Sequence, residues 1–101
     1  MRELLAKAQE LQGKLASLQQ ELARRTVEAS AGGGMVSAVV DGDLRVREVR
    51  IDPELLREND RAMLQDLCAA AVNAALAKAQ RMVQEEMQRA SGLPISLGGA
   101  R

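Results

Sequence analysis

The chain has 101 residues, enough for one domain with a modest core; 47% of them are hydrophobic, yet none is aromatic. Its 14 basic residues balance its 14 acidic ones, so the whole protein has no net charge to attract nucleic acid or a membrane. No apolar run reaches the ~18 residues of a membrane span, and the charged N-terminus does not fit a signal peptide. A lone cysteine suits a reducing cytoplasm.

Residues 2–25 are predicted to form an amphipathic helix. Apolar side chains recur there at alternating spacings of three and four, which is the heptad spacing of a seam between helices. The seam comprises Met1, Leu4, Ala8, Leu11, Leu15, Leu18 and Leu22. A helix that docks on its own subunit explains such a stripe, and a seam between two subunits is the alternative. The helix also carries more basic than acidic residues, so any anion-binding surface must be local.

Residues 26–51 change to an apolar period of two, which predicts three antiparallel strands. The triplet Gly32-Gly33-Gly34 is expected at the first hairpin tip rather than in a phosphate nest, because no Gly-Lys-Ser/Thr follows it. The pair Asp41-Gly42 predicts a type I′ turn with positive φ at both central residues. The third strand, Leu44–Ile51, changes parity midway, so a β-bulge near Arg47–Glu48 is needed to bring its apolar side chains to one face.

A long amphipathic helix is predicted from Asp60 to about Arg89, after a short helical turn over Pro53–Leu56 that Asp52 caps. Such a helix is about 45 Å long, whereas a compact domain of ~100 residues has a radius of gyration near 13 Å. Its apolar face is therefore longer than one copy can cover, and we expect a homodimer. The expected interface residues are Leu64, Leu67, Cys68, Ala71, Val72 and Ala75.

These segments predict an α+β fold of order α-β-β-β-α, with a three-stranded antiparallel sheet and two long helices. The sequence Ser91-Gly92-Leu93-Pro94 breaks the last helix, so residues 91–101 are expected to form a flexible C-terminal tail.

The residue types exclude most catalytic chemistry. Without histidine, neither a Cys–His nucleophile nor an ordinary Cys/His zinc site can form, and Cys68 falls within the apolar stripe as a structural thiol. Four carboxylates precede the predicted helix starts, where capping explains them better than a metal site does. These are Asp52, Glu54, Glu58 and Asp60. We predict no enzyme, cofactor, metal or small-molecule substrate; a carboxylate-dependent hydrolase is the remote alternative.

The lack of aromatic residues also disfavours single-stranded nucleic acid, which is normally bound by stacking. The phosphates of a duplex are a better target for Lys and Arg. A two-fold dimer presents every basic group twice, so patches that are weak singly can bind together. The candidate DNA-binding residues are Lys7, Lys14, Arg24, Arg25, Arg45, Arg50, Lys78 and Arg81.

Four segments carry a family resemblance: Ala6–Gln12, Asp41-Gly42, Val49–Pro53 and Met63–Ala75. In this order and spacing they resemble the YbaB/EbfC nucleoid-associated proteins of bacteria. The resemblance implies an intertwined homodimer that binds duplex DNA, associates with the nucleoid in the cytoplasm, and influences DNA organisation and gene expression. Residues 1–90 are then a single dimerisation and DNA-binding domain. The alternative is a protein-interaction adaptor dimer whose DNA binding is incidental.

Overall fold

A computed structural model describes residues 1–92 of the chain. Its elements are α1 (Arg2–Arg24), β1 (Thr26–Ala31), β2 (Val36–Asp41), β3 (Val46–Ile51), α2 (Pro53–Arg57) and α3 (Arg61–Ser91). The predicted α+β fold with a three-stranded antiparallel sheet and two long helices is confirmed, and α2 is the short helical turn expected before α3. Ser91, which was predicted to belong to the C-terminal tail, is instead the last residue of α3, and the rest of that prediction, at residues 93–101, lies outside the described residues.

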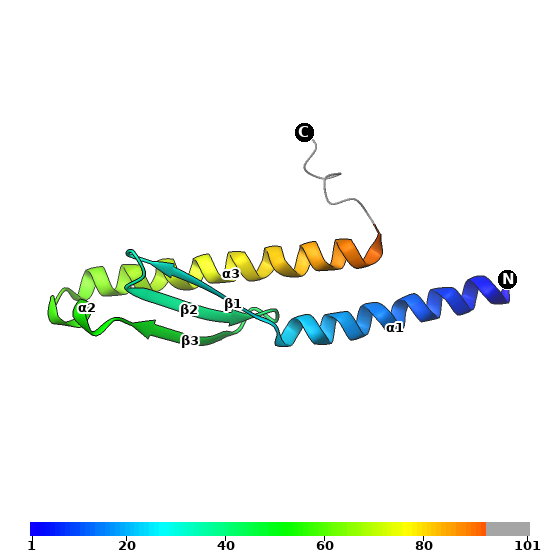
Figure 1. Cartoon of the computed structure of the whole chain (residues 1–101), viewed down its shortest axis with the longest axis horizontal. Helices are drawn as coiled ribbons and strands as arrows, with labels where there is room; N and C mark the ends of the chain where they lie inside the picture. The colour runs from blue at the N-terminus through cyan, green and yellow to red at the C-terminus, as the bar shows by residue number, and fades with distance from the viewer. Residues whose placement is uncertain (93–101) are drawn as a thin grey trace, which may run out of the picture.

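The core lies between the sheet and α3. The strands follow the order β1-β2-β3, and α3 runs along one face, mainly over β1 and β2 (Figure 1). Alternate residues of β2 face a row of small side chains on α3, and Leu55 of α2 closes one end. The fully buried residues of this cluster are Val36, Ala38, Val40, Leu55, Ala71, Ala75 and Ala79. Alanine on the helix lets the two backbones approach closely, so a thin two-layer core forms without any aromatic residue.

The β-bulge expected in the third strand is confirmed. Val39 pairs with Glu48, but the next residue, Val40, pairs with Val46, so Arg47 is the extra residue on β3. An inserted residue reverses the parity of a strand. As a result all three apolar residues of β3 lie opposite buried residues of β2 and share the face on which α3 packs.

The turn between β2 and β3 differs from the predicted type I′ geometry. The positive φ is at Leu44 (64°), which lies outside the strand, whereas Gly42 has no positive φ. Glycine is required at position 42 for space, because a Cβ there would lie 2.0 Å from the carbonyl oxygen of Leu22. The Gly42 N–H also donates to the carbonyl oxygen of Arg25 (3.0 Å). This turn is therefore shaped by the end of α1 packed against it, which a local turn rule does not include.

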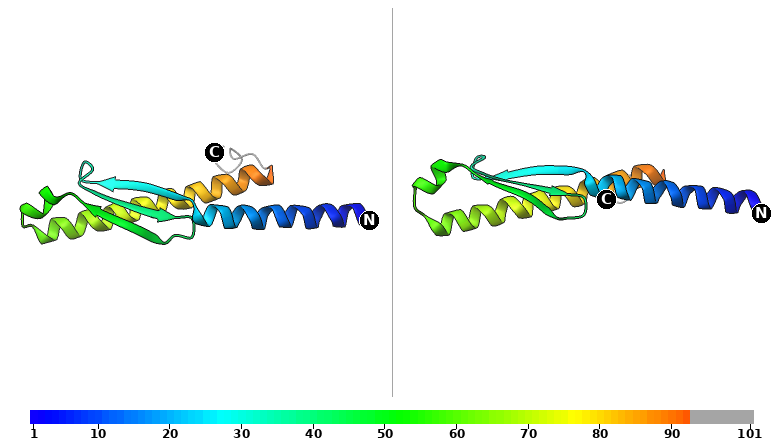
Figure 2. Two further views of the ribbon diagram at one scale, coloured as in Figure 1. Left: turned by 60° about the horizontal axis from the view of Figure 1, so that its bottom comes forward. Right: turned by 90° about the horizontal axis from the view of Figure 1, so that it is seen from below.

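Most of α1 extends beyond the sheet, as Figures 1 and 2 show. Leu22 is its one buried residue, while Leu4 is 72% and Leu11 48% exposed. The expectation of a helix docked along its whole stripe is therefore wrong except near its C-terminal end. The chain measures 68 × 31 × 15 Å, with a radius of gyration of 18.8 Å against about 13 Å for a compact domain of this size. Much apolar surface on α1 is thus left uncovered in a single chain.

Candidate nucleic-acid interface

The basic residues of α1 differ in how far their charge is already balanced. Lys7 and Arg24 are exposed and have no carboxylate partner within residues 1–92. Lys14 lies 3.9 Å from Glu10 with both side chains largely in solvent, where such a pair contributes little. Arg25 instead joins α1 to α3 through Glu86, at 3.7 Å. Lys7 and Arg24 are consequently the α1 cations most available to an external phosphate.

On the sheet, Arg50 is held by carboxylates. Its guanidinium lies 2.8 Å from Glu48 and 3.5 Å from Glu28, on the face of the sheet away from α3. The hydrogen bond and charge of Glu48, with the charge of Glu28, raise the pKa of Arg50 above its usual value, and Arg50 in turn lowers the pKa of Glu48. Arg50 therefore keeps less unbalanced charge than Arg45, which is exposed in the β2–β3 turn and forms no ion pair within residues 1–92.

The two predicted cations of α3 point in different directions. Lys78 donates through Nζ to the backbone carbonyl oxygen of Glu28 at 3.0 Å, so it lies against β1, and no carboxylate of residues 1–92 pairs with it. Arg81 follows the buried Ala79 by two residues, which is about 200° around the helix, so it points away from the sheet. The eight predicted DNA-binding residues therefore do not converge on one patch of a single chain.

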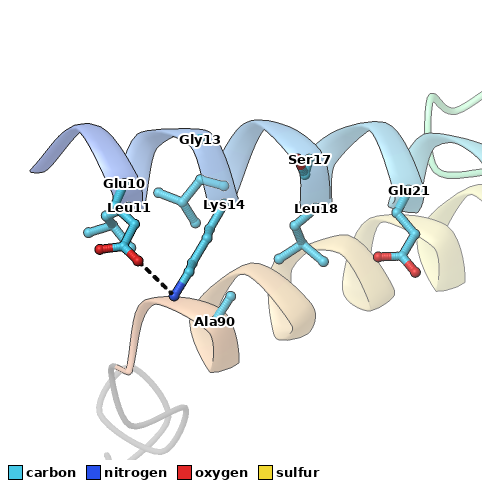
Figure 3. A pocket seen from close by; sticks show the side chains of 9 residues that line it. Glu10, Leu11, Gly13, Lys14, Ser17, Leu18, Glu21 and Ala90 are labelled. Atoms are coloured by element: carbon cyan, nitrogen blue, oxygen red, sulfur yellow. Dashed lines mark ion pairs between the residues drawn. The ribbon is translucent and has the colours of Figure 1, made fainter. Parts of the chain in front are cut away.

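A groove lies between α1 and the end of α3 (Figure 3). Leu11 and Leu18 form part of its apolar floor, and Lys14, paired with Glu10, extends toward Ala90 of α3. Glu21 lines the same groove, so its carboxylates outnumber its one lysine. This charge disfavours phosphate, and the groove is better suited to an apolar segment. No motif in the sequence indicated it, because it depends on how far the two helices diverge.

The carboxylates considered for a metal site are used to start and fix helices. Asp52 accepts from the N–H of Glu54 (2.9 Å), and Asp60 accepts from the N–H of Met63 (3.0 Å). Glu54 also pairs with Arg57 at 2.6 Å. Within residues 1–92 no three metal-ligating side chains gather at one place. Capping, the interpretation favoured from the sequence, accounts for Asp52 and Asp60.

Sequence reasoning missed the role of Asp41, the buried carboxylate that fixes the β2–β3 turn. Its Oδ2 accepts from Nε of Arg47 (2.7 Å), and its Oδ1 accepts from the N–H groups of Asp43 (2.9 Å) and Arg45 (3.1 Å). The Arg47 hydrogen bond, followed by those from the backbone, holds the pKa of Asp41 below its usual value against the opposing effect of burial. The bulge residue thus anchors the turn that presents Arg45.

Replacing Asp41 with asparagine should make stability less dependent on pH. A carboxylate whose pKa is lowered by folding stabilises the protein above its unfolded pKa, near 3.8, and loses that effect as the pH falls through the folded pKa. The difference in unfolding free energy between wild type and Asp41→Asn should therefore be largest near neutral pH and shrink below pH ~4. Urea denaturation across this range measures it. An unchanged difference under acid conditions contradicts the assignment.

The structure also locates the six residues predicted at a dimer interface. Ala71 and Ala75 have no exposed surface because they pack under the sheet of the same chain. In this arrangement they cannot contact a second copy. The other four are partly buried and pack around that core: Leu64, Leu67, Cys68 and Val72. Much of the apolar face of α3 is therefore covered by the chain's own sheet rather than left for a second copy.

Comparison with known proteins identifies the family. Residues 1–93 match the YbaB/EbfC DNA-binding family. The chain belongs to this family. A nucleoid-associated protein of Syntrophobacter fumaroxidans is 51% identical over 82 residues, covering 81% of this chain and 74% of that protein. A nucleoid-associated protein of Acetivibrio thermocellus is 46% identical over 96 residues, covering 95% of this chain and 82% of that protein.

A solved structure shares the fold of this YbaB/EbfC chain. The crystal structure of an uncharacterized protein from Helicobacter pylori superimposes with a TM-score of 0.69 at 20% sequence identity, covering 84% of this chain and 89% of that one. Such low identity supports the fold alone. Residues 1–92 contain no helix long and apolar enough to cross a membrane.

Proposed function

We propose that the protein is a homodimer that binds duplex DNA mainly through the phosphate backbone, within the bacterial nucleoid, and influences DNA organisation and gene expression. Membership of a DNA-binding family over residues 1–93 is the observation that carries the proposal. The names of the relatives from S. fumaroxidans and A. thermocellus support the cellular setting. The proposal assigns no reaction, cofactor or small-molecule substrate to the protein.

The distribution of charge supports phosphate contacts rather than base reading. Among residues 1–92 several cations lack a carboxylate partner, including Lys7, Arg24, Arg45 and Arg81. They are spread along an elongated chain, which suits a long polyanion better than a small ligand. The chain has no aromatic side chain to stack on bases.

Dimerisation is needed because one chain offers too few free cations in one place. A two-fold axis duplicates each of them at a fixed separation, and two weak sites on one rigid body bind a single duplex far more tightly than either does alone. Zero net charge then restricts DNA binding to these duplicated surfaces, so the affinity should depend strongly on salt.

Fluorescence anisotropy with several unrelated duplexes tests the proposal. We expect similar affinities for all sequences and a linear fall of log affinity with log salt, each neutralised phosphate contributing about 0.9 to the slope. Sedimentation in the same buffers should give a species of twice the 10.9 kDa chain mass. Failure to bind any duplex at low salt refutes DNA binding, and a folded monomer at micromolar concentration refutes the dimer.

A protein-interaction adaptor is the second candidate, favoured by the uncovered leucines on α1 and by the apolar groove beside α3. Reversing the charges of Arg24 and Arg25 separates the two functions. A DNA-binding protein loses affinity for the duplex, whereas an adaptor retains its protein partner.

A further inference from the structure

One carboxylate on α3, that of Glu86, lies between two arginines. Arg89, three residues further along α3, contacts it at 2.5 Å, and Arg25 at the end of α1 lies 3.7 Å away. Only 28% of the Glu86 side chain is exposed, against 64% for Glu54 in the solvent-exposed pair on α2. Because less water screens a partly buried charge, Glu86 attracts its two arginines more strongly than an exposed carboxylate would.

The backbone of Arg25 is fixed on both sides, whereas its side chain is free to change partner. The Arg25 N–H donates to the carbonyl oxygen of Leu22 (3.1 Å), and the Arg25 carbonyl oxygen accepts from the N–H of Gly42 (3.0 Å). Its side chain is 48% exposed, and the 3.7 Å contact with Glu86 is too long for a hydrogen bond. The guanidinium can therefore exchange one anionic partner for another while the backbone at the end of α1 stays in place.

We propose that Glu86 competes with DNA phosphate for Arg25 and thereby limits the affinity of the protein for duplex DNA. Carboxylates and phosphates both offer a guanidinium two negatively charged oxygen acceptors, so one can replace the other. Arg24, the neighbouring residue, is exposed and has no carboxylate partner within residues 1–92. A phosphate bound at Arg24 then meets the competing carboxylate next to it. This inference rests on the proposed DNA binding and adds a residue that opposes it.

Replacing Glu86 with glutamine should strengthen duplex binding about tenfold at low salt. Glutamine keeps the size of the side chain but has no charge, so Arg25 loses its anionic partner. Arg89 still has Glu85 four residues before it on the helix, a spacing at which opposite charges pair. One guanidinium is thus released in each copy of a dimer. The plot of log affinity against log salt should become steeper by about 2, which anisotropy titrations measure.

Glu85→Gln is the matched control, because it removes the same charge from the neighbouring residue. Glu85 is exposed and forms no ion pair within residues 1–92. Salt screens its longer-range effect on DNA, so its replacement should raise affinity by no more than about twofold. The difference between the two variants therefore measures the release of Arg25 rather than the change in net charge.

Arg25→Gln completes the comparison as a double-mutant cycle. Because Glu86 already holds Arg25, this single substitution should weaken binding by no more than about threefold. In its background Glu86→Gln should give no larger gain than Glu85→Gln, since no guanidinium remains at position 25 to be released. Circular dichroism should report the same fold for every variant, and Glu86→Ala against Glu85→Ala repeats the comparison without an amide.

The affinities of these variants decide between competition and other roles of Glu86. If Glu86→Gln binds no more tightly than Glu85→Gln, or if its gain persists without Arg25, competition is refuted while DNA binding stands. Weaker binding by Glu86→Gln also refutes it, and indicates instead that Glu86 positions the end of α1 for DNA. A wild type that binds no duplex at low salt refutes both this inference and the proposed function.

Discussion

Replacing Lys7 and Arg24 with glutamine should weaken duplex binding by at least about a hundredfold at low salt. Both side chains are exposed on α1 and lack a carboxylate partner within residues 1–92, so their charge is free to meet phosphate. In a dimer the double substitution removes four such charges. The plot of log affinity against log salt should become shallower by about 3 to 4, which anisotropy titrations measure.

The control for this experiment removes the same amount of charge elsewhere. Arg57 and Arg89 are exposed but paired, at 2.6 Å with Glu54 and 2.5 Å with Glu86. Converting both to glutamine should change affinity by no more than about threefold, because their charges are already balanced. Equal losses from the two double variants mean that overall charge, not contact by α1, drives binding, and this contradicts the proposed interface.

Replacing Gly42 with alanine should lower the free energy of unfolding by about 3 kcal/mol. The added Cβ would lie 2.0 Å from the carbonyl oxygen of Leu22, and this backbone atom cannot move aside alone. Separating the turn from α1 also strains the hydrogen bond from Gly42 to Arg25 and exposes Leu22, the one buried residue of α1. Urea denaturation followed by circular dichroism measures the loss.

Gly13→Ala provides the matched control, because it adds the same methyl group to open space on α1. Alanine favours a helix over glycine by ~1 kcal/mol, so this variant should be slightly more stable than wild type. If the two variants change the free energy of unfolding in opposite directions, the loss at Gly42 comes from its close contact and not from replacing glycine in general. If Gly42→Ala is as stable as wild type, the turn does not need the close approach described here.

Rules based on local sequence correctly predicted several features that are determined by residues close together in the chain. The parity change in the third strand predicted the bulge because side chains alternate strictly, and the structure places the extra residue at Arg47. Asp52 was predicted as one cap and either Asn59 or Asp60 as the other, because a short polar side chain there can reach the free N–H groups of its own helix, and the structure uses Asp52 and Asp60. Each of these features depends on residues at most a few positions apart.

Features that depend on distant segments could not be predicted in this way. A stripe of apolar residues on a helix does not reveal what covers it, so Ala71 and Ala75 looked like interface residues although their own sheet buries them. The sequence likewise does not reveal which charged side chains form ion pairs with distant residues. Arg25 and Glu86 are far apart in the sequence, and only folding shows that they pair. Which cations are free for DNA is therefore a property of the fold rather than of the composition.

Because α1 is attached near its C-terminal end, a small rotation there displaces its N-terminal end by a much larger distance. Its 23 residues form a rod of about 35 Å that is held around Leu22 and extends past the sheet. A pivot of about 10° at that end displaces the opposite tip by about 6 Å, close to two base-pair steps of a duplex. Such a rotation would move Lys7 without disturbing the alanine-lined core, which α1 does not join.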